Sequence, residues 1–431
     1  MTTPRGPRCD DEAGDAGPDA ARRPRSDHPL RYNRNFRRLW IGETVSQLGT
    51  QISVVAVPLA AVTTLHANAF QVGLLTAIET AAFAVLGLPA GAWCDRWRRR
   101  PVLVAADLVR AVALGTVPVA ASAGVLSYAQ LCAVVAIVGV ATVFFDVDYQ
   151  SFLPNLVGRE HLVAANGALE ASRSAAALAG PSIGGFLVQA FTAPYAIAAD
   201  AVSFVWSGGW ISLIDAADPR PVRDPTSSVA REIAEGLRFV FTHRVLRMLA
   251  GSTGTFNFFN GIYNAVVVVF LVRVIHLDSG VVGALFSAAG IGGLMGALVA
   301  NRVRTAVGGP ASIIFSAVSL AVLAPLAPLT AEGWRLGLFV VWSLLGAVAI
   351  SVYNIATVSY RQEICPQPLL GRMNATMRFV VWGTLPLGGL LGGLLGQTLG
   401  LRAALWVAAA GTIASPLWVL VSPLARPGRT R

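Results

Sequence analysis

Long apolar stretches are the feature that most constrains the fold of this chain. Each is about 20 residues or longer, the length that a helix needs to cross the hydrocarbon core of a bilayer. Composition agrees, because 55% of the residues are hydrophobic and only 13% are charged. Backbone groups in lipid must be hydrogen-bonded within the protein, so each stretch is predicted to be a transmembrane helix. The twelve predicted segments are 38–64, 70–93, 101–122, 126–149, 163–191, 194–214, 246–272, 279–301, 310–330, 335–358, 370–398 and 401–423.

The distribution of arginine predicts the topology. All 33 basic residues are arginine, and they gather in the first 36 residues, in alternate loops such as 96–100 and 302–304, and in the segment 215–247. Loops rich in positive charge stay in the cytoplasm. A multi-pass protein of the cytoplasmic (inner) membrane with both termini in the cytoplasm is therefore expected. The net charge of +10 then reflects topology rather than binding to nucleic acid.

One long connection divides the chain into two halves. In this connection Val229, Ile233, Leu237 and Val240 recur at helical spacing, with charged residues between them. That pattern predicts an amphipathic helix on the cytoplasmic face, with a partner-binding segment as the alternative. The predicted parts are a disordered cytoplasmic tail (1–36), an N-terminal six-helix bundle (37–214), a cytoplasmic linker (215–245), a C-terminal six-helix bundle (246–425) and a second tail (426–431).

The two halves share a sequence pattern. Pro154 is followed by Asn166 and Pro181, and Pro366 is followed in the same order by Asn374 and Pro386. Internal repeats of six helices are typical of transporters whose substrate site lies between the halves near the middle of the membrane. The predicted fold class is an all-α membrane protein with twelve transmembrane helices in two pseudo-symmetric six-helix bundles.

Two motifs resemble those of a known family. The run GAWCDRWRRR (91–100) resembles the signature between the second and third helices of the major facilitator superfamily, with Arg98 where that signature usually has glycine. The run LVAANGALEASRSAAALAGPSIGG (162–185) resembles the subgroup of macrolide-efflux proteins and the enterobactin exporter. The resemblance covers about residues 35–425.

The resemblance implies a conformational latch in the first motif. Asp95 would face the N-terminus of segment 370–398 across the two halves, where an anion gains about 0.3–1 kcal/mol, and the latch would favour the outward-open state. Arg96 or Arg100 would pair with Asp146. The alternative is that these arginines only set the topology. The candidate latch residues are Gly91, Asp95, Arg96, Arg99, Arg100 and Asp146.

Small residues in segment 163–191 are similar to the antiporter signature of the same superfamily. Proline removes one backbone donor and bends a helix, and small residues permit close helix packing. The resemblance implies a seal against proton leak, and plain packing is the alternative. The residues of this motif are Ala176, Gly180, Pro181, Gly184 and Gly185.

Carboxylates within the predicted spans are candidates for proton coupling, because ionisable groups are costly in a membrane. Glu79, near the middle of its segment, is the first candidate and Glu43 is the second. Either could instead hydrogen-bond to a neighbouring helix. Asp107 and Arg110 lie three residues apart and are expected to neutralise each other.

Amides and aromatic residues in the second half are candidates for a substrate cavity. A mostly apolar pocket with a few polar groups is the usual site for a small molecule. Hydrogen bonding between helices is the alternative for each asparagine. The candidates are Asn257, Asn260, Tyr263, Asn264, Tyr353, Asn354, Arg378 and Trp382.

The expected function is export of an amphipathic small molecule, such as a drug, siderophore or secondary metabolite, in antiport with protons. The chain has no lysine and hence no GxxxxGK[ST] loop, so the proton gradient is the expected energy source and no cofactor or metal is predicted. The expected partners are the substrate and the lipid bilayer, without nucleic acid or an obligate protein partner. An enzyme is not expected. The alternatives are a proton-independent facilitator or importer and a non-transporting membrane sensor.

Overall fold

The computed structural model describes residues 30, 33–94, 97–158, 161–215, 229–366 and 369–425, which form helices without any strand. The N-terminal bundle contains α2 (Arg34–Leu59, continued by a π-helical segment, Ala60–Thr64), α3 (Ala69–Cys94), α4 (Arg99–Ser122), α5 (Tyr128–Val157), α6 (Leu162–Phe191) and α7 (Ala193–Ser212). The remaining helices are α8 (Val229–Thr242), α9 (Arg244–Arg273), α10 (Ser279–Val307), α11 (Gly309–Leu323), α12 (Leu336–Ile364), α13 (Leu370–Trp382), α14 (Leu385–Thr398), α15 (Leu401–Ala414) and α16 (Leu417–Leu420).

The predicted fold class is confirmed. Within the described ranges, eleven helical segments are long and apolar enough to cross a membrane. The twelfth predicted segment, α7, has 20 residues but is less apolar, because it holds Asp200 together with several serines and glycines. It nevertheless packs between α2 and α4 inside the N-terminal bundle.

Proline divides one of the predicted segments. The stretch 370–398 forms two helices, α13 and α14, which are separated at Gly383 and Thr384. Pro386 stands in the first turn of α14, where the missing amide donor of proline costs nothing. The half-helix α13 packs against α8, and the side chains of Arg372 and Glu235 form an ion pair between them. The amphipathic helix predicted in the linker is therefore present as α8.

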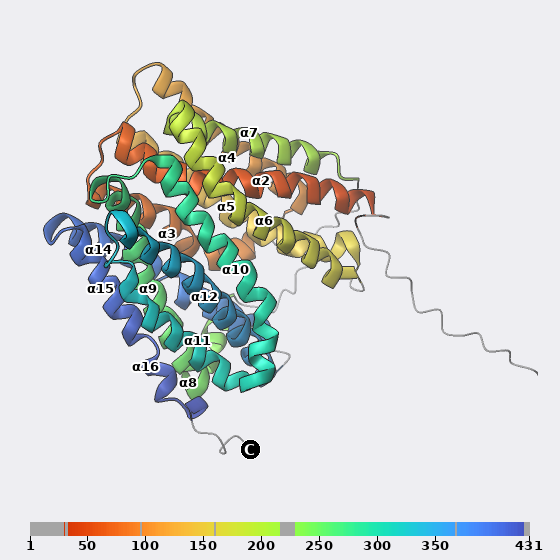
Figure 1. Cartoon of the computed structure of the whole chain (residues 1–431). Coiled ribbons are helices and arrows are strands. Elements are labelled where there is room, and N and C mark those ends of the chain that lie inside the picture. Colours follow the sequence, from red (N-terminus) through yellow and green to blue (C-terminus); the bar gives the residue numbers. More distant parts are fainter. Residues whose placement is uncertain are drawn as a thin grey trace, which may run out of the picture.

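The two bundles meet mainly through the pairs α6–α10 and α3–α14, and α3 also contacts α9 and α13. Figure 1 shows α6 and α10 adjacent at one end of the molecule and spreading apart toward the other end. We call these the closed end, which carries the loops 65–68 and 274–278, and the open end, which carries residues 97–98 and 307–308.

Glycines let the backbones of the two bundles touch at the closed end. A Cβ built on Gly283 of α10 would lie 2.9 Å from the Cα of Gly185 on α6, closer than real Cβ atoms approach. On α14, Gly389 and Gly393 face α3, and a Cβ built on Gly73 would lie 2.6 Å from the Cα of Gly393. Two polar links join the bundles here: the hydroxyls of Ser182 and Ser287 lie 2.7 Å apart, and Arg273 donates to the carbonyl of Ala67 at 2.7 Å.

Candidate functional site: two connected cavities

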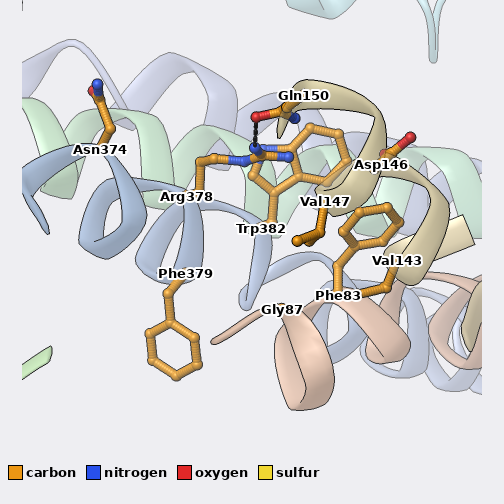
Figure 2. A pocket seen from close by; sticks show the side chains of 10 residues that line it. All are labelled: Phe83, Gly87, Val143, Asp146, Val147, Gln150, Asn374, Arg378, Phe379 and Trp382. Atoms are coloured by element: carbon orange, nitrogen blue, oxygen red, sulfur yellow. Dashed lines mark hydrogen bonds between the residues drawn. The ribbon is translucent and has the colours of Figure 1, made fainter. Parts of the chain in front are cut away.

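The first cavity lies between the bundles and has a volume of about 340 Å³. We call it the interbundle cavity. Figure 2 shows its walls, which come from α3 and α5 on one side and from α13 on the other. Its lining residues are Phe83, Gly87, Val143, Asp146, Val147, Gln150, Asn374, Arg378, Phe379 and Trp382.

Two contacts cross the interbundle cavity. Arg378 donates a long hydrogen bond of 3.5 Å to Oε1 of Gln150 (Figure 2). The rings of Phe83 and Trp382 have their centroids 5.7 Å apart. Each bundle thus supplies both aromatic and polar side chains to the same space, an arrangement suited to an amphipathic ligand.

The second cavity, also of about 340 Å³, lies inside the N-terminal bundle. We call it the acidic cavity because four carboxylates line it: Glu43 of α2, Glu79 of α3, Asp146 of α5 and Asp200 of α7. Phe83 and Asp146 line both cavities, so the two spaces adjoin. Of the four carboxylates, Asp146 also lines the interbundle cavity, where a ligand would contact it.

The two predicted coupling residues face the same cavity. Glu43 is 7% exposed, and its Oε1 accepts a hydrogen bond of 2.6 Å from Gln47, while its Oε2 has no partner among the residues that the structure describes. Glu79 is exposed to the space of the cavity. Its helix lies close to α5, since a Cβ built on Gly139 would be 3.1 Å from the carbonyl oxygen of Glu79. Which of the two carries a proton stays a prediction.

Hydroxyl groups donate hydrogen bonds to both carboxylate oxygens of Asp200. Ser53 of α2 donates to its carboxylate at 2.6 Å, and Ser203 donates at 3.1 Å. Asp200 is 2% exposed and forms no ion pair with any described residue. The helices can approach here because Gly49 leaves room, since its built Cβ would lie 2.6 Å from the carboxylate of Asp200.

The predicted pair Asp107–Arg110 is confirmed as a buried ion pair. The guanidinium carbon of Arg110 also lies 4.4 Å from the ring centroid of Phe145 and 4.1 Å from that of Phe204. A cation between two aromatic faces gains further electrostatic attraction. Arg110 therefore ties α4 to α5 and α7, and it is one of the residues that line the acidic cavity.

Arg110→Ala is expected to lower the stability of the folded chain by about 3–5 kcal/mol, because it leaves the buried carboxylate of Asp107 without its partner. The thermal midpoint in detergent measures the effect. The double variant Asp107→Leu/Arg110→Met, which removes both charges, is expected to melt at a higher temperature than Arg110→Ala. A single variant as stable as the wild type would contradict the assignment.

The structure describes only part of the predicted latch. Asp95 and Arg96 lie outside the described residues, so the latch itself stays a prediction. Gly91 lies in the last turn of α3, and Arg99 begins α4. Arg100 donates to the carbonyl of Ser212 at the end of α7.

Asp146, the remaining residue of the predicted latch, lies where the two cavities adjoin. Arg110 and Arg173 line the acidic cavity together with Asp146, and Arg378 lines the interbundle cavity together with it.

The antiporter-like motif takes part in two interfaces. Gly180 and Gly184 face α2, where a Cβ on Gly184 would lie 3.0 Å from the carbonyl oxygen of Ile52. Gly185 and the carbonyl of Pro181 face Gly283 of α10 across the bundles. Ala176 is buried. A role as a seal against protons stays a prediction.

The predicted substrate residues separate into groups. Only Arg378 and Trp382 line the interbundle cavity. Asn257 donates to the carbonyl of Val381 at 3.0 Å, and the hydroxyl of Tyr353 lies 2.9 Å from that of Thr253, so both join helices.

The others lie elsewhere in the C-terminal bundle. Asn260 and Tyr263 line a small space of about 10 Å³ among α9, α12 and α15. Asn264 and Asn354 are exposed but line neither cavity. Sequence reasoning missed Phe83 and Gln150, although each lies four residues after a candidate carboxylate and hence on the same helix face.

Two six-helix bundles around a central cavity that is closed at one end define a membrane transporter of the major facilitator type. Residues 26–428 match the family described as transmembrane secretion effectors, and the chain belongs to this family. It is 29% identical over 399 residues to the multidrug efflux pump Tap of Mycobacterium tuberculosis, covering 88% of this chain and 91% of that protein. The Tap pump of Mycolicibacterium fortuitum is 28% identical over 367 residues, with 80% and 84% covered.

Solved structures share the fold. The nucleoside transporter NupG superposes with a TM-score of 0.75 at 10% identity and covers 90% of this chain and 98% of its own. A bacterial homologue of the iron transporter ferroportin, in its inward-facing state, gives a TM-score of 0.72 at 17% identity with the same coverage. These similarities establish the architecture.

Proposed function

We propose that this transporter exports an amphipathic small molecule across the cytoplasmic membrane in exchange for protons. The observation that carries the proposal is the acidic cavity, in which Glu43 and Glu79 face one space that adjoins the interbundle cavity. Groups that can bind a proton thus border on a space that can bind a substrate. The multidrug efflux activity named for the Tap relatives supports export as the direction.

The distribution of charge supports a cytoplasmic open end. Arginines at the open end include Arg99, Arg100, Arg302, Arg304, Arg361 and Arg372, whereas the closed end holds Arg273, Arg335 and Arg402. By the positive-inside rule the open end faces the cytoplasm, and α2 begins at that end. The structure then corresponds to an inward-facing state that is ready to take up substrate from the cell.

Exchange of substrate for protons follows if the substrate and the proton compete for the same carboxylates. In the inward-facing state, a charged carboxylate at Glu79 favours a polar or cationic part of the substrate. When the bundles rock and the cavity opens outside, a proton neutralises the carboxylate and weakens that interaction, so the substrate leaves. Return of the protonated carrier to the inward-facing state releases the proton into the cytoplasm.

Everted membrane vesicles test the proposal. Vesicles containing the chain, energised by an inward-acidic gradient, are expected to accumulate an amphipathic fluorescent dye, and a protonophore is expected to abolish the accumulation. Vesicles without the chain provide the control. Dye equilibration that ignores the protonophore would show a facilitator instead, and failure to move any of a panel of amphiphiles would favour a non-transporting sensor.

A further inference from the structure

The acidic cavity holds more carboxylates than the described arginines pair with. Glu43, Glu79 and Asp200 line it, and none of them forms an ion pair with a residue in the described ranges. Of the two arginines on its wall, Arg110 is paired with Asp107, and Arg173 is paired with Glu170 at 3.9 Å. The titratable groups of this cavity that lack a charged partner among the described residues are therefore carboxylates.

A buried oxygen in this cavity points to a ligand. Oε2 of Glu43 is buried and lacks a hydrogen-bond partner among the described residues, although Gln47 donates to Oε1 of the same carboxylate. An unsatisfied buried carboxylate oxygen is costly. A donor on a cationic ligand would remove that cost, so this oxygen can serve as a contact for a positively charged group.

The opposite wall offers the opposite charge. Arg378 on α13 is exposed in the interbundle cavity, and its one hydrogen bond among the described residues is the 3.5 Å contact with Gln150. Figure 2 shows its side chain extending across the cavity toward α5. A guanidinium group with five donors is suited to hold a carboxylate in a bidentate pair.

An aromatic surface lies between the two charges. Phe83 lines both cavities, and its ring contacts that of Trp382, which is 45% exposed. Phe83 and Glu79 lie one helical turn apart on α3, so the ring stands directly beside the acidic cavity. A flat ring system resting here would have carboxylates on its N-terminal-bundle side and Arg378 on the other.

We propose that the substrate is a zwitterionic aromatic molecule, with its cationic nitrogen among Glu79 and Glu43, its ring system against Phe83 and Trp382, and its anionic group on Arg378. The proposal rests on the function proposed above and adds the substrate class. Because the two charges bind to different bundles, such a molecule also links the N-terminal bundle to α13.

Three dyes with one ring scaffold test the substrate class. Rhodamine 110 is a zwitterion, its methyl ester rhodamine 123 is a cation, and fluorescein is an anion. Binding to the purified full chain in nanodiscs is measured by fluorescence anisotropy. Rhodamine 110 is expected to bind at least about tenfold more tightly than either other dye, since each lacks one of the two charge-assisted contacts.

Arg378→Gln distinguishes loss of the contact with the anionic group from a general loss of folding. In this variant the affinity for rhodamine 110 is expected to fall to that for rhodamine 123, while the affinity for rhodamine 123 stays unchanged. A folding defect would instead weaken the binding of both dyes. Arg304→Gln removes an arginine that pairs with Glu363 at the open end, away from both cavities, and is expected to keep the preference.

Several results would overturn the proposal: equal affinity for rhodamine 110 and rhodamine 123, an unchanged preference in Arg378→Gln, or no binding of any dye. The binding measurement needs no proton gradient. Tight, selective binding of rhodamine 110 without protonophore-sensitive transport would overturn the proposed proton exchange alone.

Discussion

Glu79→Gln is expected to reduce accumulation of substrate in energised vesicles to the level of wild-type vesicles treated with a protonophore. Glutamine has nearly the same shape as glutamate but cannot exchange a proton in this pH range, so the gradient can no longer drive transport. Exchange of labelled for unlabelled substrate, which needs no gradient, is expected to persist, and binding is expected to weaken without being lost, because Glu43 still lines the cavity.

Glu363→Gln is the matched control for this variant. Glu363 is an exposed residue near the end of α12 and pairs with Arg304, remote from both cavities. The Glu363→Gln variant is expected to transport at the wild-type rate. If Glu79→Gln accumulated substrate to the wild-type ratio under the same gradient, Glu79 would have no part in coupling, and Glu43 would be the next residue to test.

Gly283→Leu is expected to reduce transport by about tenfold or more by preventing closure at the closed end. A Cβ at this position already approaches the Cα of Gly185 to 2.9 Å, and leucine adds three further carbons. Overpacking costs about 1–3 kcal/mol, and 1.4 kcal/mol shifts an equilibrium tenfold. The added side chain therefore favours the state in which α6 and α10 are separated at the closed end, while each bundle stays folded. Initial transport rates at matched expression measure the effect.

Gly293→Leu provides the comparison on the same helix. A Cβ built on Gly293 meets no atom within 4 Å, so this variant is expected to transport at nearly the wild-type rate. Equal rates for the two variants would show that contact between α6 and α10 does not limit transport. Loss of activity in both would instead indicate that α10 tolerates no added bulk.

The helices could be predicted from sequence because their signal is local. Segments such as 279–301 could be located from their length and apolarity. In the structure this helix begins at Ser279, as predicted, and ends a few residues later than predicted, at Val307. The predicted end of segment 126–149 came too early, since α5 continues to Val157 through polar and aromatic residues that lower the local apolarity. Arg110 and Asp107 were paired correctly because their spacing is fixed by the helix itself.

The connected cavities could not be predicted in the same way. Glu43 and Glu79 belong to different helices, and their convergence depends on how α2, α3 and α5 pack. Asn257 illustrates the same limit, because its hydrogen bond to Val381 depends on the break between α13 and α14. A polar side chain on an isolated helix has no fixed partner until the tertiary packing supplies one.

The glycines of α14 bear on the energy of switching between states. Gly389 and Gly393 place the backbone of α14 against that of α3, while Gly388 and Gly392 do the same against α9. Surfaces made of backbone have no side-chain rotamers to rearrange when they part, so separation is close to a rigid-body step. To reverse a population from 1:99 to 99:1, a ligand must supply about 5.5 kcal/mol of differential binding. A few charge-assisted contacts in the cavities are on that scale, so differential binding of a ligand there can drive the transition.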